Sequence, residues 1–139
     1  QNEWAGGLSI RHFRSATQIN RALTQAAVAV DDVDWYLLHQ ANARILQSVT
    51  KKLKADPAKF PINIDEHGNT SAASVPILLA QLAEDGRLQR GQRLVLSGFG
   101  GGLSVGSLIV IINSMFESDA LAVAEARLWV RFCWRLQNS

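Results

Sequence analysis

Short apolar runs alternate along this chain with longer stretches in which apolar residues recur at helical spacing. The apolar runs have the length of buried strands: 35–38, 60–64, 94–96 and 105–112. The amphipathic stretches predict three helices: 15–30, 43–54 and 71–85. A short glycine-rich turn joins the last two strands, which predicts an antiparallel pair. Alternation of this kind is typical of an α/β fold, in which helices cover the faces of a layered sheet.

Individual residues mark the expected ends of two of these helices. Asn42 is expected to cap the second helix at its N-terminus, because its short side chain can accept a hydrogen bond from a free backbone N–H. Thr70 or Ser71 is expected to do the same for the third helix. Gly86 is expected to end that third helix.

Composition bounds the class of protein. Apolar residues make up 47% of the 139 residues and charged residues 19%, which excludes a disordered polar chain. The longest apolar stretch, 108–112, is too short to span a bilayer, and a net charge of +2 does not require a nucleic-acid partner. The single cysteine and the lack of a secretory signal in residues 1–20 predict a cytoplasmic protein.

Two polar loops each follow an expected strand. The first holds His39 within the run LLHQAN, and the second holds Asn69 within HGNTSAAS. Loops at strand ends of an α/β fold converge on one edge of the sheet, where a histidine and an asparagine can both donate hydrogen bonds to one oxygen. Such a pair stabilises an enolate or oxyanion. The residues alone also leave open a second interpretation, in which His39 has only a structural role and Asn69 only forms the turn beside Gly68.

The runs HQANARI, GNTSAAS and GFGGGLSVGS, in this order, resemble the C-terminal half of a β-ketoacyl-acyl carrier protein synthase III, a condensing enzyme of the thiolase fold. The likeness runs from about residue 13 to residue 112. It implies a thiolase-like layered sheet-and-helix fold, C-terminal half only, with a synthase domain over 1–112 and an atypical tail over 113–139. Arginines and apolar residues recur at helical spacing in that tail. Two interpretations stay open: an amphipathic helix, or extra sequence whose helical periodicity arose by chance.

The resemblance implies an acyltransferase of fatty acid biosynthesis. Enzymes of this family condense an acyl-CoA with malonyl-acyl carrier protein in a decarboxylative Claisen reaction, using a Cys, His, Asn triad and no cofactor or metal. His39 and Asn69 match the His and Asn, which stabilise the thioester enolate. The family's Cys lies in an N-terminal half to which nothing here corresponds, and Cys133, the only thiol, follows both motifs. We therefore expect the isolated chain to be inactive without the Cys-bearing half.

Further residues are implied to bind substrate and partner. Phe99 and Gly101 match positions that line the pocket, and Arg44 matches a residue that docks the acyl carrier protein or the phosphates of its pantetheine arm. Lys51 and Lys52 extend this basic face, although a merely solvated helix face explains the lysines almost as well. The implied partners are acyl-CoA, acyl carrier protein and either the missing N-terminal half or a second copy of the chain.

The glycines at 98, 100, 101 and 102 fit neither a P-loop nor a dinucleotide-binding fingerprint, so close backbone packing beneath the site is the expected reason for them. A second function stays open: a non-catalytic module that binds acyl chains or carrier protein. The small residues of 71–74 predict a helix face that packs closely against another layer. A chain with one half of the fold leaves such a face uncovered, which predicts self-association or marginal stability.

Overall fold

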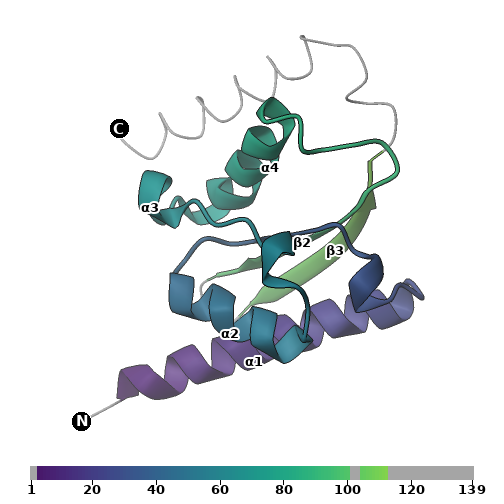
Figure 1. The fold of residues 1–139 in the computed structure, drawn as a ribbon. Coiled ribbons are helices and arrows are strands. Elements are labelled where there is room, and N and C mark those ends of the chain that lie inside the picture. Colours follow the sequence, from purple (N-terminus) through teal and green to yellow (C-terminus); the bar gives the residue numbers. More distant parts are fainter. Residues whose placement is uncertain (1–2, 101–103, 113–139) are drawn as a thin grey trace.

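The structure, a computed structural model, describes residues 3–100 and 104–112. They form one mixed sheet in the order β1-β2-β3, and Figure 1 shows helices on both of its faces. The strands are β1 (Trp35–Leu38), β2 (Arg93–Phe99) and β3 (Val105–Ile111). β1 pairs with β2 in parallel, and β2 pairs with β3 antiparallel, as the short glycine-rich turn predicts. The predicted α/β fold is confirmed.

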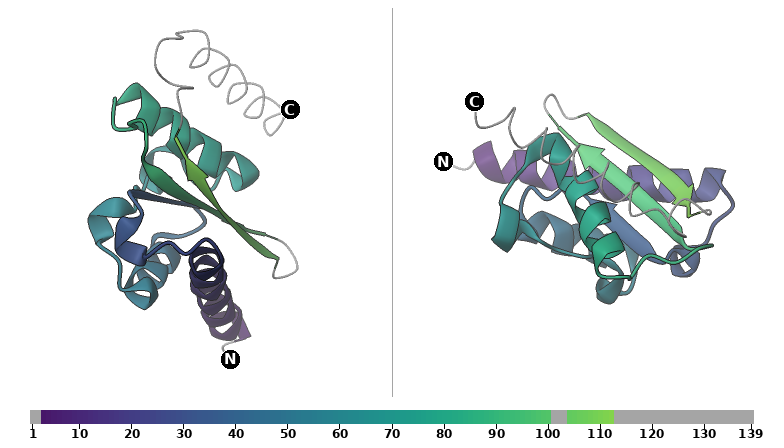
Figure 2. Two further views of the ribbon diagram at one scale, coloured as in Figure 1. Left: turned by 90° about the vertical axis from the view of Figure 1, so that its right-hand side faces the viewer. Right: turned by 90° about the horizontal axis from the view of Figure 1, so that it is seen from above.

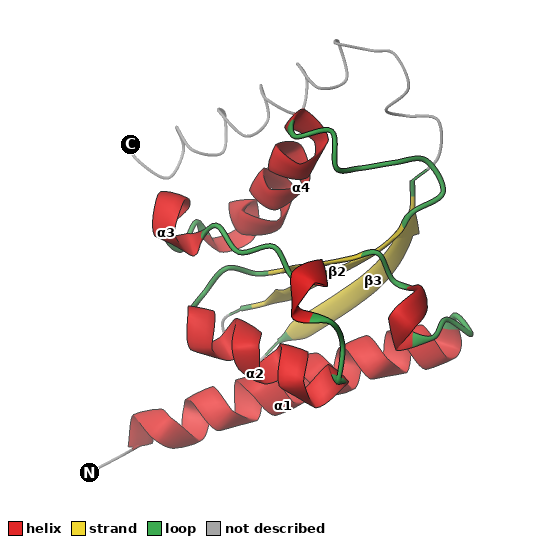
Figure 3. Cartoon of the chain, in the orientation of Figure 1, coloured by secondary structure: helices red, strands yellow, loops and turns green. Residues whose placement is uncertain are grey.

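Four helices accompany the sheet: α1 (Glu3–Gln25), α2 (Ala43–Leu53), α3 (Ile64–His67) and α4 (Ser74–Glu84). Helices α1 and α2 pack against each other and cover one face, whereas α4 covers the other (Figures 2 and 3). Short 3-10 turns precede β1, follow α2 and precede α4: Val30–Asp32, Pro57–Lys59 and Ser71–Ala73. Within the described ranges, no helix is long and apolar enough to cross a membrane.

Each face of the sheet builds its own hydrophobic core, because successive side chains of a strand point to opposite faces. Tyr36 and Leu38 of β1 lie in the core beneath α1 and α2, together with Val95 of β2. Leu37 and Leu94 lie in a second core that α4 completes. The strands read as nearly continuous apolar runs since both faces of β1 and β2 are covered.

One face of β3 is left open on the α4 side of the sheet. Leu108 pairs with Leu96, and Val110 pairs with the buried Leu94, so both side chains point to the face that α4 covers. Leu108 is nevertheless 52% exposed and Val110 37% exposed. Among the described residues, helix α4 therefore covers the half of this face that lies over β1 and β2, and it leaves the β3 half as apolar surface.

The first helix differs from the prediction over 15–30 at both ends. Helix α1 begins further upstream, at Glu3, and ends at Gln25. Ala27 adopts a left-handed conformation with φ of 53°, and the Val28 N–H donates to the Leu23 carbonyl. This is the Schellman pattern of helix termination, which glycine usually supplies. The predicted C-terminal end was wrong because alanine at position 27 does not indicate a helix end as glycine would.

The strand predicted over 60–64 is absent from the sheet. Phe60 is buried, but its ring stacks on Tyr36 at 4.5 Å between centroids instead of entering a ladder. Pro61 has no N–H to donate to a neighbouring strand. The Asn63 N–H donates to the side-chain oxygen of Gln40, and Ile62 is exposed. The alternating apolar residues of this segment therefore anchor a loop through single contacts and do not form a strand.

The third helix is shorter than the predicted 71–85. Ser71 has a φ of 51°, so the chain enters a 3-10 turn before α4 begins at Ser74. Neither Thr70 nor Ser71 provides the side-chain cap expected of it. The other two signals hold: Gly86 follows the end of α4 with a φ of 66°, and Asn42 caps α2 by accepting a hydrogen bond from the Arg44 N–H at 2.8 Å.

Candidate active site

His39 and Phe99 meet at the edge of the sheet where β1 and β2 both end. His39 directly follows β1, and its N–H donates to the Ser97 carbonyl at 2.9 Å, which extends the parallel pairing by one residue. Phe99 is the last residue of β2. The two rings pack edge to face, with centroids 4.9 Å apart and planes inclined by 73°. In α/β sheets this carboxyl edge is where functional side chains gather.

Ser74 holds the other side of the His39 ring. Its hydroxyl oxygen lies 2.7 Å from Nδ1 of His39 and accepts a hydrogen bond from the Gln40 N–H at 3.2 Å, and the hydroxyl donates to the Ser71 carbonyl at 2.9 Å. Ser74 is the first residue of α4 and only 1% exposed. The imidazole is therefore fixed between the end of β2 and the start of α4.

Gln40 fixes the loop that carries the histidine. Its side chain is fully buried; Nε2 donates to the Leu38 carbonyl at 2.9 Å, and Oε1 accepts from the Asn63 N–H at 3.2 Å. Sequence reasoning missed both Gln40 and Ser74. The available signal was that each is a polar residue inside one of the two motifs, next to the end of a strand or the start of a helix.

Asn69 lies in the loop between α3 and the turn that precedes α4. Its Oδ1 accepts a hydrogen bond from the Ser71 N–H at 3.1 Å. The oxygen end of the amide thus faces the loop backbone. The side chain is exposed. Through Ser71, whose carbonyl lies beside the Ser74 hydroxyl, the loop of Asn69 is joined to the group that contacts His39.

Burial sets the charge state of the histidine. Desolvation lowers the pKa of His39 below its ordinary value of 6.5, and a hydrogen bond with the Ser71 backbone opposes that shift in part. The imidazole is consequently neutral near pH 7. A neutral imidazole carries one N–H, so it donates one hydrogen bond and accepts another.

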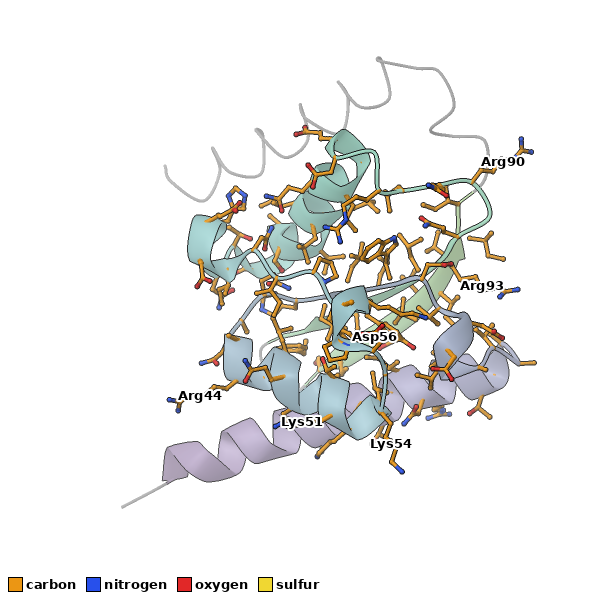
Figure 4. The ribbon with its side chains drawn as sticks, viewed as in Figure 1. Arg44, Lys51, Lys54, Asp56, Arg90 and Arg93 are labelled. Carbon is orange, nitrogen blue, oxygen red and sulfur yellow. The ribbon has the colours of Figure 1, made fainter. Side chains whose placement is uncertain are left out.

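The three basic residues singled out from the sequence lie exposed on α2. Arg44 projects outward from the start of the helix, directly after the His39 loop, and Lys51 lies toward its far end (Figure 4). Arg44 and Lys51 are two helical turns apart and leave the same side of α2, whereas Lys52 is rotated from Arg44 by roughly 80° about the helix axis. Of these three cations, Arg44 is the nearest to His39 in the sequence.

Other residues singled out from the sequence fall elsewhere. Gly101, Cys133 and the tail over 113–139 lie outside the described residues. A Cβ added at Gly98 or Gly100 would meet nothing within 4 Å, so the close packing expected at these glycines was wrong for this chain. Within residues 3–100 and 104–112, no group of three or more His, Cys, Asp or Glu side chains is placed to hold a metal ion.

Comparison with known proteins identifies relatives of this arrangement. Residues 23–112 match the family described as 3-oxoacyl-[acyl-carrier-protein] synthase III C terminal. The chain is 55% identical over 92 residues to the β-ketoacyl-[acyl-carrier-protein] synthase III of Lactobacillus helveticus, covering 66% of this chain and 28% of that protein. It is 50% identical over 99 residues to the enzyme of the same name from Streptococcus gordonii, covering 70% of this chain and 31% of that protein.

Solved structures agree with this match. The 3-oxoacyl-[acyl-carrier-protein] synthase III of Aquifex aeolicus superposes with a TM-score of 0.76 at 29% identity, over 81% of this chain and 36% of that one. The Pseudomonas aeruginosa enzyme gives a TM-score of 0.75 at 32% identity, over 81% and 35%. The chain spans about a third of the length of the curated relatives that it matches. It belongs to the 3-oxoacyl-[acyl-carrier-protein] synthase III family and corresponds to the C-terminal part of that fold.

Proposed function

We propose that this chain supplies the enolate-stabilising part of a cytoplasmic condensing enzyme of fatty acid biosynthesis. The reaction joins an acyl-CoA to malonyl-acyl carrier protein with loss of carbon dioxide. The observation that carries the proposal is the fixed, neutral His39, held between Phe99 and Ser74 and joined through Ser71 to the loop of Asn69. Family membership supports assigning this cluster to condensation.

Decarboxylation explains the need for two hydrogen-bond donors. When the carbon–carboxylate bond of the malonyl thioester breaks, its electron pair forms an enolate, and negative charge develops on the thioester oxygen. The N–H of neutral His39 and the Nδ2 hydrogens of Asn69 are the donors proposed for that oxygen. Donors that are already oriented need no rearrangement as the charge appears, which lowers the barrier.

Bond formation needs a group that this part of the enzyme does not provide. The acyl group must be held as a thioester, which we assign to a cysteine in the rest of the protein. The enolate carbon attacks the acyl carbonyl, the new carbon–carbon bond forms, and the thiolate leaves. Cys133 follows both motifs and stands between Phe132 and Trp134, in surroundings unlike those of the family's nucleophile, so it is not the proposed nucleophile.

Carrier-protein docking is the role proposed for Arg44. Its guanidinium is exposed at the start of α2, beside the His39 loop, where it can pair with a phosphate or carboxylate at the mouth of the site. Lys51 and Lys52 continue the positive charge along the helix. Charges at such a rim attract an acidic partner mainly by steering its approach.

The open face of β3 is the surface proposed to meet the rest of the enzyme. Leu108 and Val110 form apolar surface on the side of the sheet that α4 covers only in part. Ser71 and Ala72, small residues beside α4, are also exposed. A partner layer over the open face of β3 would bury Leu108 and Val110. In the absence of that layer, a second copy of the chain is the proposed occupant.

A non-catalytic module that binds acyl chains or carrier protein is the alternative function. This alternative predicts that the chain binds acyl chains or carrier protein without a partner, and that adding a Cys-bearing part produces no condensation. The two functions therefore differ in one observation, which is whether condensation appears when the missing part is supplied.

The first prediction concerns turnover. The chain alone will not condense acetyl-CoA with malonyl-acyl carrier protein, but the chain co-purified with the N-terminal part of the Lactobacillus helveticus relative will. In that complex, Asn69→Ala and His39→Ala each lower the rate of malonyl decarboxylation about a hundredfold or more, because each removes an oxyanion donor. Asn42→Ser, which keeps a good helix cap, is the matched control and leaves the rate unchanged. Near-full decarboxylation in Asn69→Ala contradicts its assigned role.

The second prediction concerns the protonation of His39. Because its pKa is lowered on folding, the unfolded chain binds this proton more readily than the folded chain does. The free energy of unfolding therefore falls as the pH decreases through about 6.5 and stops falling from this cause below the folded-state pKa. Urea titrations at several pH values will show a steeper fall for the wild type than for His39→Gln. Equal slopes would mean that folding does not lower this pKa.

The third prediction concerns the carrier protein. Arg44→Glu weakens binding of an acidic acyl carrier protein to the chain several-fold at low salt, and the difference shrinks as salt rises, since the attraction is between exposed charges. Calorimetric titration measures it. Arg21→Glu, the same change of charge at an exposed position of α1, leaves the affinity unaltered. An equal effect at Arg21 would show that only net charge matters.

The fourth prediction concerns association. Sedimentation at micromolar concentration will show oligomers of the isolated chain, and Leu108→Lys will shift the distribution toward monomer. Ile62→Lys is the control, because Ile62 is 46% exposed and lies outside the three strands. A wild-type chain that stays monomeric, with a cooperative melt, would contradict the uncovered-face interpretation and favour an independent module.

A further inference from the structure

Strand β3 lies at one edge of the sheet. Within residues 3–100 and 104–112, β2 is its one neighbouring strand, and the two pair without a bulge from Val105 opposite Phe99 to Ile111 opposite Arg93. The seven residues of β3, VGSLIVI, include no proline and no charged side chain. Proteins usually protect an edge strand with such a feature, because its outward N–H and C=O groups can pair with another strand. The edge of β3 therefore lacks the usual protection.

The hydrogen bonds at both ends of β3 show which of its backbone groups point outward. The Ile112 N–H donates to the Gln92 carbonyl at 2.9 Å, and the Ser104 carbonyl accepts from the Gly100 N–H at 3.0 Å. Both of these even-numbered residues thus face β2. Because the direction of the backbone groups alternates along a strand, residues 106, 108 and 110 also face β2. The N–H and C=O groups of residues 105, 107, 109 and 111 point away from the sheet.

Hydrogen bonds on the other side of β2 lead to the same assignment. The carbonyls of Arg93 and Ser97 accept from the N–H groups of Asp34 and His39, so the odd-numbered residues of β2 face β1. The even-numbered residues of β2 must then face β3, and the register pairs them with even-numbered residues of β3. The odd-numbered residues of β3 consequently form a row of donors and acceptors along the edge.

A second copy of β3 is complementary to this row. Two antiparallel copies related by a twofold axis at Leu108 place Ser107 opposite Ile109 of the copy and Val105 opposite Ile111 of the copy. All outward-facing groups from 105 to 111 then bond across the axis, since opposed residues of an antiparallel pair exchange both bonds. Neither strand carries a charge that would oppose the pairing.

The side chains on the open face fit the same register. Leu108, which is 52% exposed, meets Leu108 of the copy, and Val110 lies opposite Gly106. A Cβ added at Gly106 meets nothing within 4 Å, so the backbone there leaves room for the valine of the copy. A shift of the axis to residue 107 or 109 would leave the outward groups of Ile111 or Val105 without a partner on β3. The register centred on Leu108 therefore satisfies the most groups.

We propose that two copies of the isolated chain join edge to edge through β3, in antiparallel register centred on Leu108, and form one continuous sheet. This inference rests on the proposed function only for the expectation that the chain meets a second copy. The proposed function names an apolar face as the surface of contact. The edge adds backbone hydrogen bonds, which fix the direction and the register of the partner strand.

Disulfide trapping tests the register. Cys133→Ser removes the only cysteine, and one new cysteine is then placed on β3. Opposed residues of a non-hydrogen-bonded pair have Cα atoms about 4.5 Å apart, which a disulfide can span. Leu108→Cys is expected to give several-fold more cross-linked dimer on oxidation than Val110→Cys. Val110 is the matched control because it lies exposed on the same face, but it is offset from its copy by roughly 13 Å along the strands.

A mixture of two variants gives a second reading of the register. Position 106 of one copy lies opposite position 110 of the other, so a mixture of Gly106→Cys and Val110→Cys chains is expected to cross-link. Each of these variants by itself is expected to stay uncross-linked. The open space around Gly106 means that the added side chain itself causes no clash.

A proline substitution tests the backbone bonds without any cysteine. Ile111 directs its N–H away from β2, and its side chain is 55% exposed. Ile111→Pro therefore removes an outward donor while the pairing of β2 with β3 persists. Sedimentation at micromolar concentration is expected to show monomer for Ile111→Pro and dimer for Ile111→Val, which keeps the N–H. Both variants are expected to retain a cooperative melt.

Equal cross-linking at positions 108 and 110, no cross-linking at 108, or an Ile111→Pro chain that associates as fully as Ile111→Val overturns the inference. Oligomers without this pattern contradict edge pairing alone, because condensation by the reconstituted complex does not depend on it. A complex that fails to condense, while the isolated chain cross-links at position 108, contradicts the proposed function alone.

Discussion

The parallel pairing of β1 with β2 is the constraint on which the site depends. It aligns Leu38 with Ser97, so the residues that follow, His39 and Phe99, reach the same edge of the sheet although they are far apart in sequence. The pairing is buried from both sides, by α1 and α2 on one face and α4 on the other. A shift of register by one residue would turn His39 to the opposite face and remove its contacts with Phe99 and Ser74.

The same sheet fits the proposal that this chain is one part of a larger site. Its covered strands build two cores, yet the β3 half of one face is apolar and open. The proposed hydrogen-bond donors, His39 and Asn69, and the basic start of α2 lie within this chain, whereas the thiol of the proposed reaction is assigned to the rest of the protein. In the proposed function, this part of the polypeptide forms the carbanion, and the other part supplies the cysteine that holds the acyl group.

The sequence predicts most of the sheet because apolar runs bounded by polar turns have few other ways to fold. It fails where a single contact decides the backbone. Ala27 ends α1 without the glycine that usually marks such an end, and Phe60 anchors a loop by stacking on Tyr36. His39 and Asn69 stood out by type and motif. Ser74 did not, since a serine at a helix start has many ordinary explanations, and only the fold shows its hydroxyl against the imidazole.

A crystal structure of this chain, joined with a Cys-bearing N-terminal part and soaked with a non-hydrolysable malonyl thioester analogue, tests the central claim most directly. The account predicts that the thioester oxygen lies about 2.7–3.1 Å from both Nε2 of His39 and Nδ2 of Asn69, as an oxyanion hole requires. An oxygen bound by other groups, with His39 and Asn69 out of hydrogen-bonding reach, would contradict the account.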